Sequence, residues 1–298
     1  MILSDQQKYI GNTALGLAGG AAAYIWCPKV VTRQYIRYVD KYGDKFTTQE
    51  NNDIWDAGIK AYEKSPIKNK VEIIDFNKSN WEPIADKFVE RHRNYIKDKN
   101  TLIGKLRAFF AQSEEELKEK FYVYAQGKNA CYMPSTSQIL VNREKKANAL
   151  FHEMGHTMNN KGVGLGRFLA KTRGKGTKAV PFVFGISMLT PKDRDDSKIT
   201  DPVYKALLLF KKYSGLIASA CLVPLVAEEG LASIKGGKMA KGVLSPELYK
   251  KITKSNTRAF VAYALSAIMV GLGTTFANYV KDKITGPLPA DSQMSFMN

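Results

Sequence analysis

Long uncharged runs along the chain alternate with charged segments of helical pattern. The first run, residues 9–28, has 20 residues without a charge and is rich in Gly and Ala. A helix of this length is long enough to cross a bilayer. The triplet AAA at 21–23 offers small residues for signal-peptide processing, but only Lys8 and Asp5 precede the run, a poor basic leader. We therefore predict an uncleaved N-terminal transmembrane anchor over 9–28.

Residues 29–120 are charged, aromatic and mostly helical in pattern. In the stretch 81–99, Ile84, Phe88 and Ile96 fall near one face of a helix. His92 lies between two arginines, which is typical of an exposed histidine on a solvated helix rather than of a metal ligand. We predict a helical region over 29–120.

The pattern changes at residue 121. Residues 121–142 carry β-branched and aromatic runs broken by QGKN and PSTS, which predicts two or three short strands joined by turns. A helix is expected over 145–159. The Gly- and Lys-rich stretch that follows, up to residue 178, is expected to be rich in loops.

Three further apolar runs occupy 179–191, 213–227 and 259–280. The last has 22 residues between Arg258 and Lys281 and would span about 33 Å as a helix, enough to cross a membrane. The two shorter runs suit core helices, a re-entrant hairpin or short transmembrane helices. The tail 281–298 is expected to fray beyond Gly286. These elements predict an α+β fold, largely helical, with two to four membrane-embedded helices.

The net charge of +17 indicates an anionic partner. No Gly-rich phosphate loop or RNA-binding aromatic signature accompanies it, and much of the charge lies beside apolar runs. Membrane lipid is therefore the expected partner, and nucleic acid is not. The three cysteines, at 27, 131 and 221, form no C-x-x-C pair, which argues against a disulfide framework or a cysteine-based zinc site.

The strongest chemical signal is the motif H-E-x-x-H at residues 152–156. His152 and His156 are four residues apart, so on a helix both imidazoles lie on one face and can converge on one Zn²⁺ ion. Glu153 is placed to act as the general base that takes a proton from a zinc-activated water. Only three histidines exist in the chain, and two are in the motif. The alternative is a helix with two structurally bonded histidines.

Catalytic zinc usually takes three protein ligands. Gly162 occupies the position of the third histidine in the extended form of the motif, and the only other histidine is His92. A carboxylate is therefore needed. Residues 226–233, VAEEGLAS, follow an apolar run and offer Glu229 as the expected ligand. Glu228 is the alternative, either as the ligand or as a hydrogen-bond partner of a ligating histidine.

The pieces NACYMPSTSQILVN, ALFHEMGHTMN and EEGLAS resemble the membrane zinc peptidases of the HtpX and CAAX-prenyl-protease type, which are gluzincins. The resemblance covers about 121–159 and 226–233. It implies a zincin-like catalytic core within 121–258, with His152, His156 and Glu229 as zinc ligands and Glu153 as the base. Ser233 stands where the family has an aspartate, and NNKG replaces its basic-histidine pair, so the chain is a divergent relative.

The resemblance also gives a role to the strand near 127–133. In such peptidases an extended substrate pairs with the edge strand beside the zinc helix. Asn129 and Ala130 would then offer backbone groups to a peptide or protein substrate.

Charge around the apolar runs predicts orientation. If Glu229 and His156 bind the same zinc ion, the membrane crossings between them number zero or two. Basic residues follow the first run and precede the last one, and fewer stand at the opposite ends. The positive-inside rule then places the catalytic region in the cytoplasm.

The sequence therefore predicts a zinc-dependent endopeptidase of the membrane. Two alternatives remain open at this point. One is a soluble zinc peptidase whose apolar runs form its core, and the other is a basic, non-catalytic scaffold protein associated with the membrane.

Overall fold

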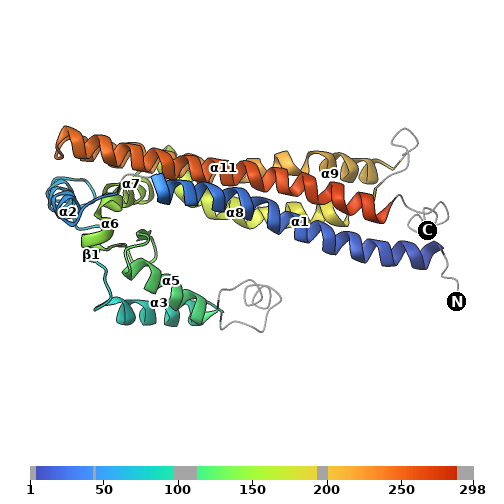
Figure 1. The fold of residues 1–298 in the computed structure, drawn as a ribbon, viewed down its shortest axis with the longest axis horizontal. Helices are drawn as coiled ribbons and strands as arrows, with labels where there is room; N and C mark the ends of the chain where they lie inside the picture. The colour runs from blue at the N-terminus through green and yellow to red at the C-terminus, as the bar shows by residue number, and fades with distance from the viewer. Residues whose placement is uncertain (1–4, 43–44, 97–112, 193–200, 287–298) are drawn as a thin grey trace. The chain divides into compact units, whose positions relative to one another are not determined.

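The computed structural model describes residues 5–42, 45–96, 113–192 and 201–286, and it is mostly helical with one small sheet (Figure 1). The chain divides into two compact units. The helical unit comprises Met1–Gly43, Phe168–Glu229 and Arg258–Asn298, and the mixed unit comprises Asp44–Arg167 and Gly230–Thr257. The expected fraying after Gly286 concerns residues that lie outside the described ranges.

The sheet of the mixed unit has three short strands in the order β1-β3-β2. β1 (Glu72–Asp75) pairs in parallel with β3 (Gln138–Val141), and β2 (Cys131–Met133) pairs antiparallel with β3. The central strand is fully buried at Ile139, Leu140 and Val141. β2 is thus an edge strand, where the sequence predicted one. β1 is a strand that the helical pattern of 29–120 did not indicate.

Helices surround this sheet. They are α2 (Thr48–Glu63), α3 (Trp81–Ile96), α5 (Glu114–Ala125), the short α6 (Arg143–Lys146) and η1 (Ala147–Ala149), and α7 (Leu150–Lys161). Capping boxes begin α2, at Thr47 and Glu50, and α5, at Ser113 and Glu116. Each box satisfies backbone N–H groups that the first helical turn leaves open. α7 contains the H-E-x-x-H motif, so the helix predicted over 145–159 is confirmed from Leu150 onward, whereas residues 145–149 belong to the end of α6 and to η1.

Residues 121–125 belong to α5, so the strand expected there is wrong. Leu117, Phe121 and Ala125 are spaced four apart and are all buried, which is the periodicity of a helix. Phe121 and Ala125 pack in a core cluster with Phe76 and Leu140. The aromatic residues that favoured a strand therefore serve helix packing instead.

The helical unit contains α1 (Asp5–Tyr42), α9 (Pro202–Cys221), most of α8 (Leu165–Leu189) and parts of α10 (Val223–Lys241) and α11 (Pro246–Thr285). α1 covers the proposed anchor 9–28. The N-cap of α9 is Asp201, whose side chain accepts hydrogen bonds from Val203 and Tyr204, and Pro202 follows it.

Glycines allow these helices to approach one another closely. A Cβ on Gly215 of α9 would lie 2.5 Å from the backbone oxygen of Gly271 on α11, and a Cβ on Gly20 of α1 would lie 2.9 Å from that of Ala277. Gly176 lies directly against the backbone oxygen of Cys221. The loop-rich stretch expected up to residue 178 is therefore wrong from Leu165 onward, because α8 begins there and Gly176 lies in a close helix contact rather than in a loop.

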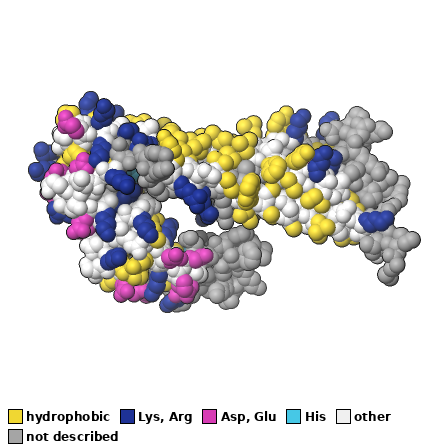
Figure 2. Space-filling model, viewed as in Figure 1, with side chains coloured by type: hydrophobic (Ala, Val, Ile, Leu, Met, Phe, Trp, Pro, Cys, Tyr) yellow, Lys and Arg dark blue, Asp and Glu magenta, His cyan; other side chains and the backbone are white. Residues whose placement is uncertain are grey.

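Within the residues that the structure describes, two helical stretches are long and apolar enough to cross a membrane, Pro202–Lys241 (α9 and α10) and Pro246–Thr285 (α11). The second contains the predicted span 259–280, and the first contains the shorter run 213–227. Figure 2 shows hydrophobic side chains, in yellow, gathered over the long helices. Cys131 and Cys221 are free thiols, whereas the side chain of Cys27 lies outside the described residues.

Candidate metal centre

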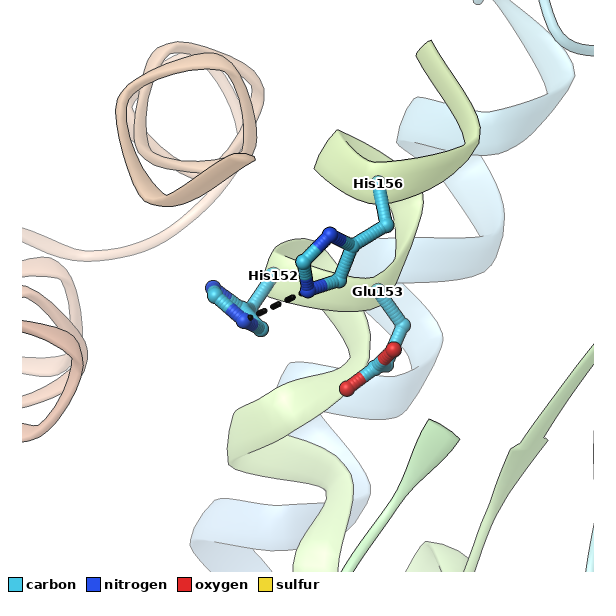
Figure 3. A group of neighbouring side chains, drawn as sticks. All are labelled: His152, Glu153 and His156. Carbon is cyan, nitrogen blue, oxygen red and sulfur yellow. Dashed lines mark hydrogen bonds between the residues drawn. The ribbon is translucent and has the colours of Figure 1, made fainter. Parts of the chain in front are cut away.

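His152, Glu153 and His156 project from one side of α7 (Figure 3). The Nε2 atoms of the two histidines lie 3.0 Å apart, and their rings meet edge to face. Ligand atoms of all three residues lie within 4.8 Å of one another. Glu153 and His156 are buried, and His152 is partly buried. The structure thus brings together the three motif residues that the sequence singled out.

The geometry of the two imidazoles suits zinc. Two nitrogen ligands at the usual zinc distance in a tetrahedral site stand about 3.3 Å apart. The observed separation of 3.0 Å between the Nε2 atoms is a few tenths shorter, so a small opening of the pair would admit the ion. Imidazole nitrogens and a carboxylate are also ligand types that zinc accepts.

Ser233 of α10 fixes the ring of His152. Its Oγ lies 3.0 Å from His152 Nδ1. A hydrogen bond at Nδ1 leaves Nε2 as the nitrogen that faces His156 and a metal ion. The hydroxyl therefore occupies the orienting position in which the resemblance expected an aspartate. The sequence showed Ser233 only as a departure, because the register of α10 against α7 is not visible in it.

That register is set by two close helix contacts. A Cβ on Gly155 of α7 would lie about 2.0 Å from the backbone oxygen of Ala232, and one on Gly236 of α10 would lie 2.1 Å from that of Phe151. The two helices therefore touch backbone to backbone on both sides of the motif. Only glycine permits this approach.

The edge strand β2 contacts the proposed base directly. The backbone N–H of Tyr132 donates to Glu153 Oε2 at 2.6 Å, and the Tyr132 hydroxyl donates to Asn160 Oδ1 at 3.1 Å. Asn129 is exposed and Ala130 is buried, and both come immediately before β2. The motif helix and the edge strand are thus adjacent, but Tyr132 rather than Asn129 or Ala130 makes the contact with the motif.

Cys131 of the same strand is not poised for metal binding or nucleophilic chemistry. Burial raises the pKa of its thiol well above the ordinary value, and the nearby negative charge of Glu153 raises it further. The thiol therefore stays protonated at neutral pH, whereas a metal ligand or nucleophile must be a thiolate.

Glu228 and Glu229 lie in the second turn of α10, and both are buried. In the helical unit, the guanidinium of Arg173 contacts both carboxylates, with Nη2 2.8 Å from Glu229 Oε1 and Nη1 against Glu228. No sequence pattern pointed to Arg173, because it lies in the Gly- and Lys-rich stretch. Glu229 precedes Ser233 by four residues on the same helix, which places the two side chains on one face about 6 Å apart along the axis.

His92, the third histidine, lies on α3 and is half-exposed. It is not part of the group formed by the motif residues.

Comparisons with protein-family models, with curated proteins and with solved structures found no match. The fold and the geometry of the motif therefore carry the functional argument on their own.

Proposed function

We propose that this protein is a zinc-dependent peptidase of the membrane, with a zincin-like core built from the three-stranded sheet and α7. The single observation that carries the proposal is the geometry of the motif. Two imidazoles converge Nε2 to Nε2, Ser233 orients one of them, and a buried carboxylate lies within 4.8 Å. An incidental pair of structural histidines would not require this combination.

His152 and His156 would hold the zinc ion through their Nε2 atoms. A zinc ion at such a site acidifies a water molecule and polarises the carbonyl group under attack. Glu153 would accept the proton of the attacking water. The N–H of Tyr132 holds the Glu153 carboxylate in place, so its orientation does not depend on the substrate. An extended peptide running along β2 would bring its carbonyl group beside this carboxylate.

The proposed third ligand is Glu229. Its support is helical spacing, because it stands one turn before Ser233 on the face of α10 that reaches His152. The guanidinium of Arg173 contacts the Glu229 carboxylate. Glu228, held by the same guanidinium, is the alternative ligand.

Ser233→Ala tests the orienting role of the hydroxyl. Loss of a hydrogen bond to a ligating histidine typically lowers metal affinity about 10–100-fold, and we expect a reduction of zinc affinity in this range. The measurement is competition for zinc against a chromogenic chelator. Ser233→Asp, which restores the residue of the resembled family, is expected to bind zinc at least as tightly as the wild type. Equal affinity of the alanine variant and the wild type would contradict the role.

Membrane association has its own support. In its most apolar stretch, the first candidate span is only 28% buried inside the protein and the second only 17%. A core helix of a soluble protein is mostly buried. Exposed side chains on these helices include Leu216, Ile268 and Leu272. Lipid would cover such surfaces. The proposed orientation, with the catalytic region in the cytoplasm, rests on the charge pattern alone. Retention of the protein in membranes after a carbonate wash would support its integration into the membrane, and release would favour a soluble peptidase.

Metal removal tests the activity. Detergent-purified protein is incubated with β-casein, an unstructured substrate, before and after treatment with a chelator. We expect cleavage to stop on chelation and to return when zinc is restored. Zinc binding without any cleavage would instead point to a non-catalytic scaffold protein.

A further inference from the structure

The helical unit contains an open cavity of about 470 Å³ far along the chain from the motif. Its walls come from α9, α11 and the residues just after α8. The charged and amide residues that line it are Lys192, Lys205, Lys211, Lys212, Asn278 and Asp282.

The lining has an excess of positive charge. Four lysines face one carboxylate, that of Asp282. This carboxylate is already bonded on two sides, because Lys211 Nζ lies 2.6 Å and Lys281 Nζ 2.9 Å from its Oδ1. Both of these lysines are buried. Asp282 therefore balances the buried lysines, and the exposed lysines at the cavity, Lys192, Lys205 and Lys212, favour an anionic ligand.

Asn278 adds an independent observation. It is 6% exposed, and its amide nitrogen donates to Ser187 Oγ at 3.1 Å and to Ser214 Oγ at 2.9 Å. Its Oδ1 is buried and has no hydrogen-bond partner among the described residues. A buried carbonyl oxygen normally has a donor.

The apolar surroundings identify the source of the anion. Leu208 and Leu209 line the same cavity, and Leu209 is 57% exposed. Phe276 and Tyr279 of α11 are also exposed, and each is next in sequence to a residue that lines the cavity. Both helices belong to the candidate membrane spans. A free phosphate ion would use only the lysines, whereas a phospholipid would also cover the leucines with its acyl chains.

We propose that this cavity binds the headgroup of an anionic phospholipid. The lysines would contact its phosphate group. The inference depends on the membrane placement proposed above but not on peptidase activity, so the two can fail separately.

Native mass spectrometry of the detergent-purified full chain tests the proposal with three probes: dihexanoyl phosphatidylglycerol, dihexanoyl phosphatidylcholine and inorganic phosphate. The variant is Lys205→Gln with Lys212→Gln. Its matched control is Lys171→Gln with Lys175→Gln, two exposed lysines of α8 that do not line the cavity. We expect wild type and control to bind one phosphatidylglycerol at least tenfold more tightly than phosphatidylcholine, and the variant to lose at least tenfold in phosphatidylglycerol affinity.

Three results would overturn the proposal. They are equal binding of the two lipids, equal phosphatidylglycerol binding by variant and control, and displacement of phosphatidylglycerol by an equal concentration of inorganic phosphate, which would make the ligand a free anion. If the double variant does not fold, Lys192→Gln replaces it, since this lysine is exposed beside the cavity. A several-fold loss of affinity is expected for it, and no change would count against the site.

Discussion

Replacing Glu153 by glutamine is expected to lower the rate of casein cleavage by about 10²–10⁴-fold while zinc stays bound. Glutamine keeps the size and the hydrogen-bond acceptor of the side chain, so it can still accept the N–H of Tyr132. It cannot take a proton from water. The nitrogens of His152 and His156 that we propose as zinc ligands are unchanged, so the zinc content of the variant should match that of the wild type.

Glu144→Gln is the matched control. Glu144 is an exposed carboxylate on α6, outside the group of motif residues. Its replacement should leave both the rate and the zinc content unchanged. A Glu153→Gln variant that cleaves casein at the wild-type rate would remove Glu153 from the base role. A variant that loses zinc together with activity would make Glu153 a ligand instead.

Gly236→Ala is expected to destabilise the mixed unit and weaken zinc retention, whereas the neighbouring Gly237→Ala is expected to do neither. A Cβ at Gly236 would lie 2.1 Å from the backbone oxygen of Phe151 and 3.1 Å from the backbone nitrogen of His152. Backbone atoms cannot move aside as a flexible side chain can, so α7 and α10 must separate. Such overpacking typically costs about 1–3 kcal/mol.

Gly237 lies on the same helix, and a Cβ there meets nothing within 4 Å. Alanine at this position should stabilise the protein by up to about 1 kcal/mol through its higher helix propensity. Thermal unfolding and zinc content, measured in parallel, test both changes. The two substitutions are expected to shift the unfolding temperature in opposite directions. Equal unfolding temperatures for the two variants would show that the close contact of α7 and α10 is not needed for the site.

The sequence predicted the part of the site that lies within one helix. The spacing of His152 and His156 determines that both rings share one face, and the structure has them meeting at Nε2. It also indicated a strand before the motif, which is the edge strand β2. These features depend on local periodicity, which is directly visible in a sequence.

The features that the sequence did not predict depend on contacts between segments far apart in the chain. Ser233 lies 81 residues from His152, and their contact depends on how α10 lies against α7. Arg173 contacts Glu228 and Glu229 because α8 is a helix where glycines suggested a loop. Glycine has the same low helix propensity whether it ends a helix or lets two helices touch, so composition alone cannot distinguish these roles.

The zinc content of the detergent-purified protein tests the central claim most directly. Wild type, His156→Ala, Glu229→Ala and His92→Ala would be compared, the last as a control that removes the one histidine outside the motif. The proposal predicts about one zinc ion per chain in the wild type and in His92→Ala, and much less in the other two variants. Zinc unchanged in Glu229→Ala alone would transfer the third ligand to Glu228. Absence of zinc from the wild type, even after it is supplied, would contradict a metal centre at residues 152–156.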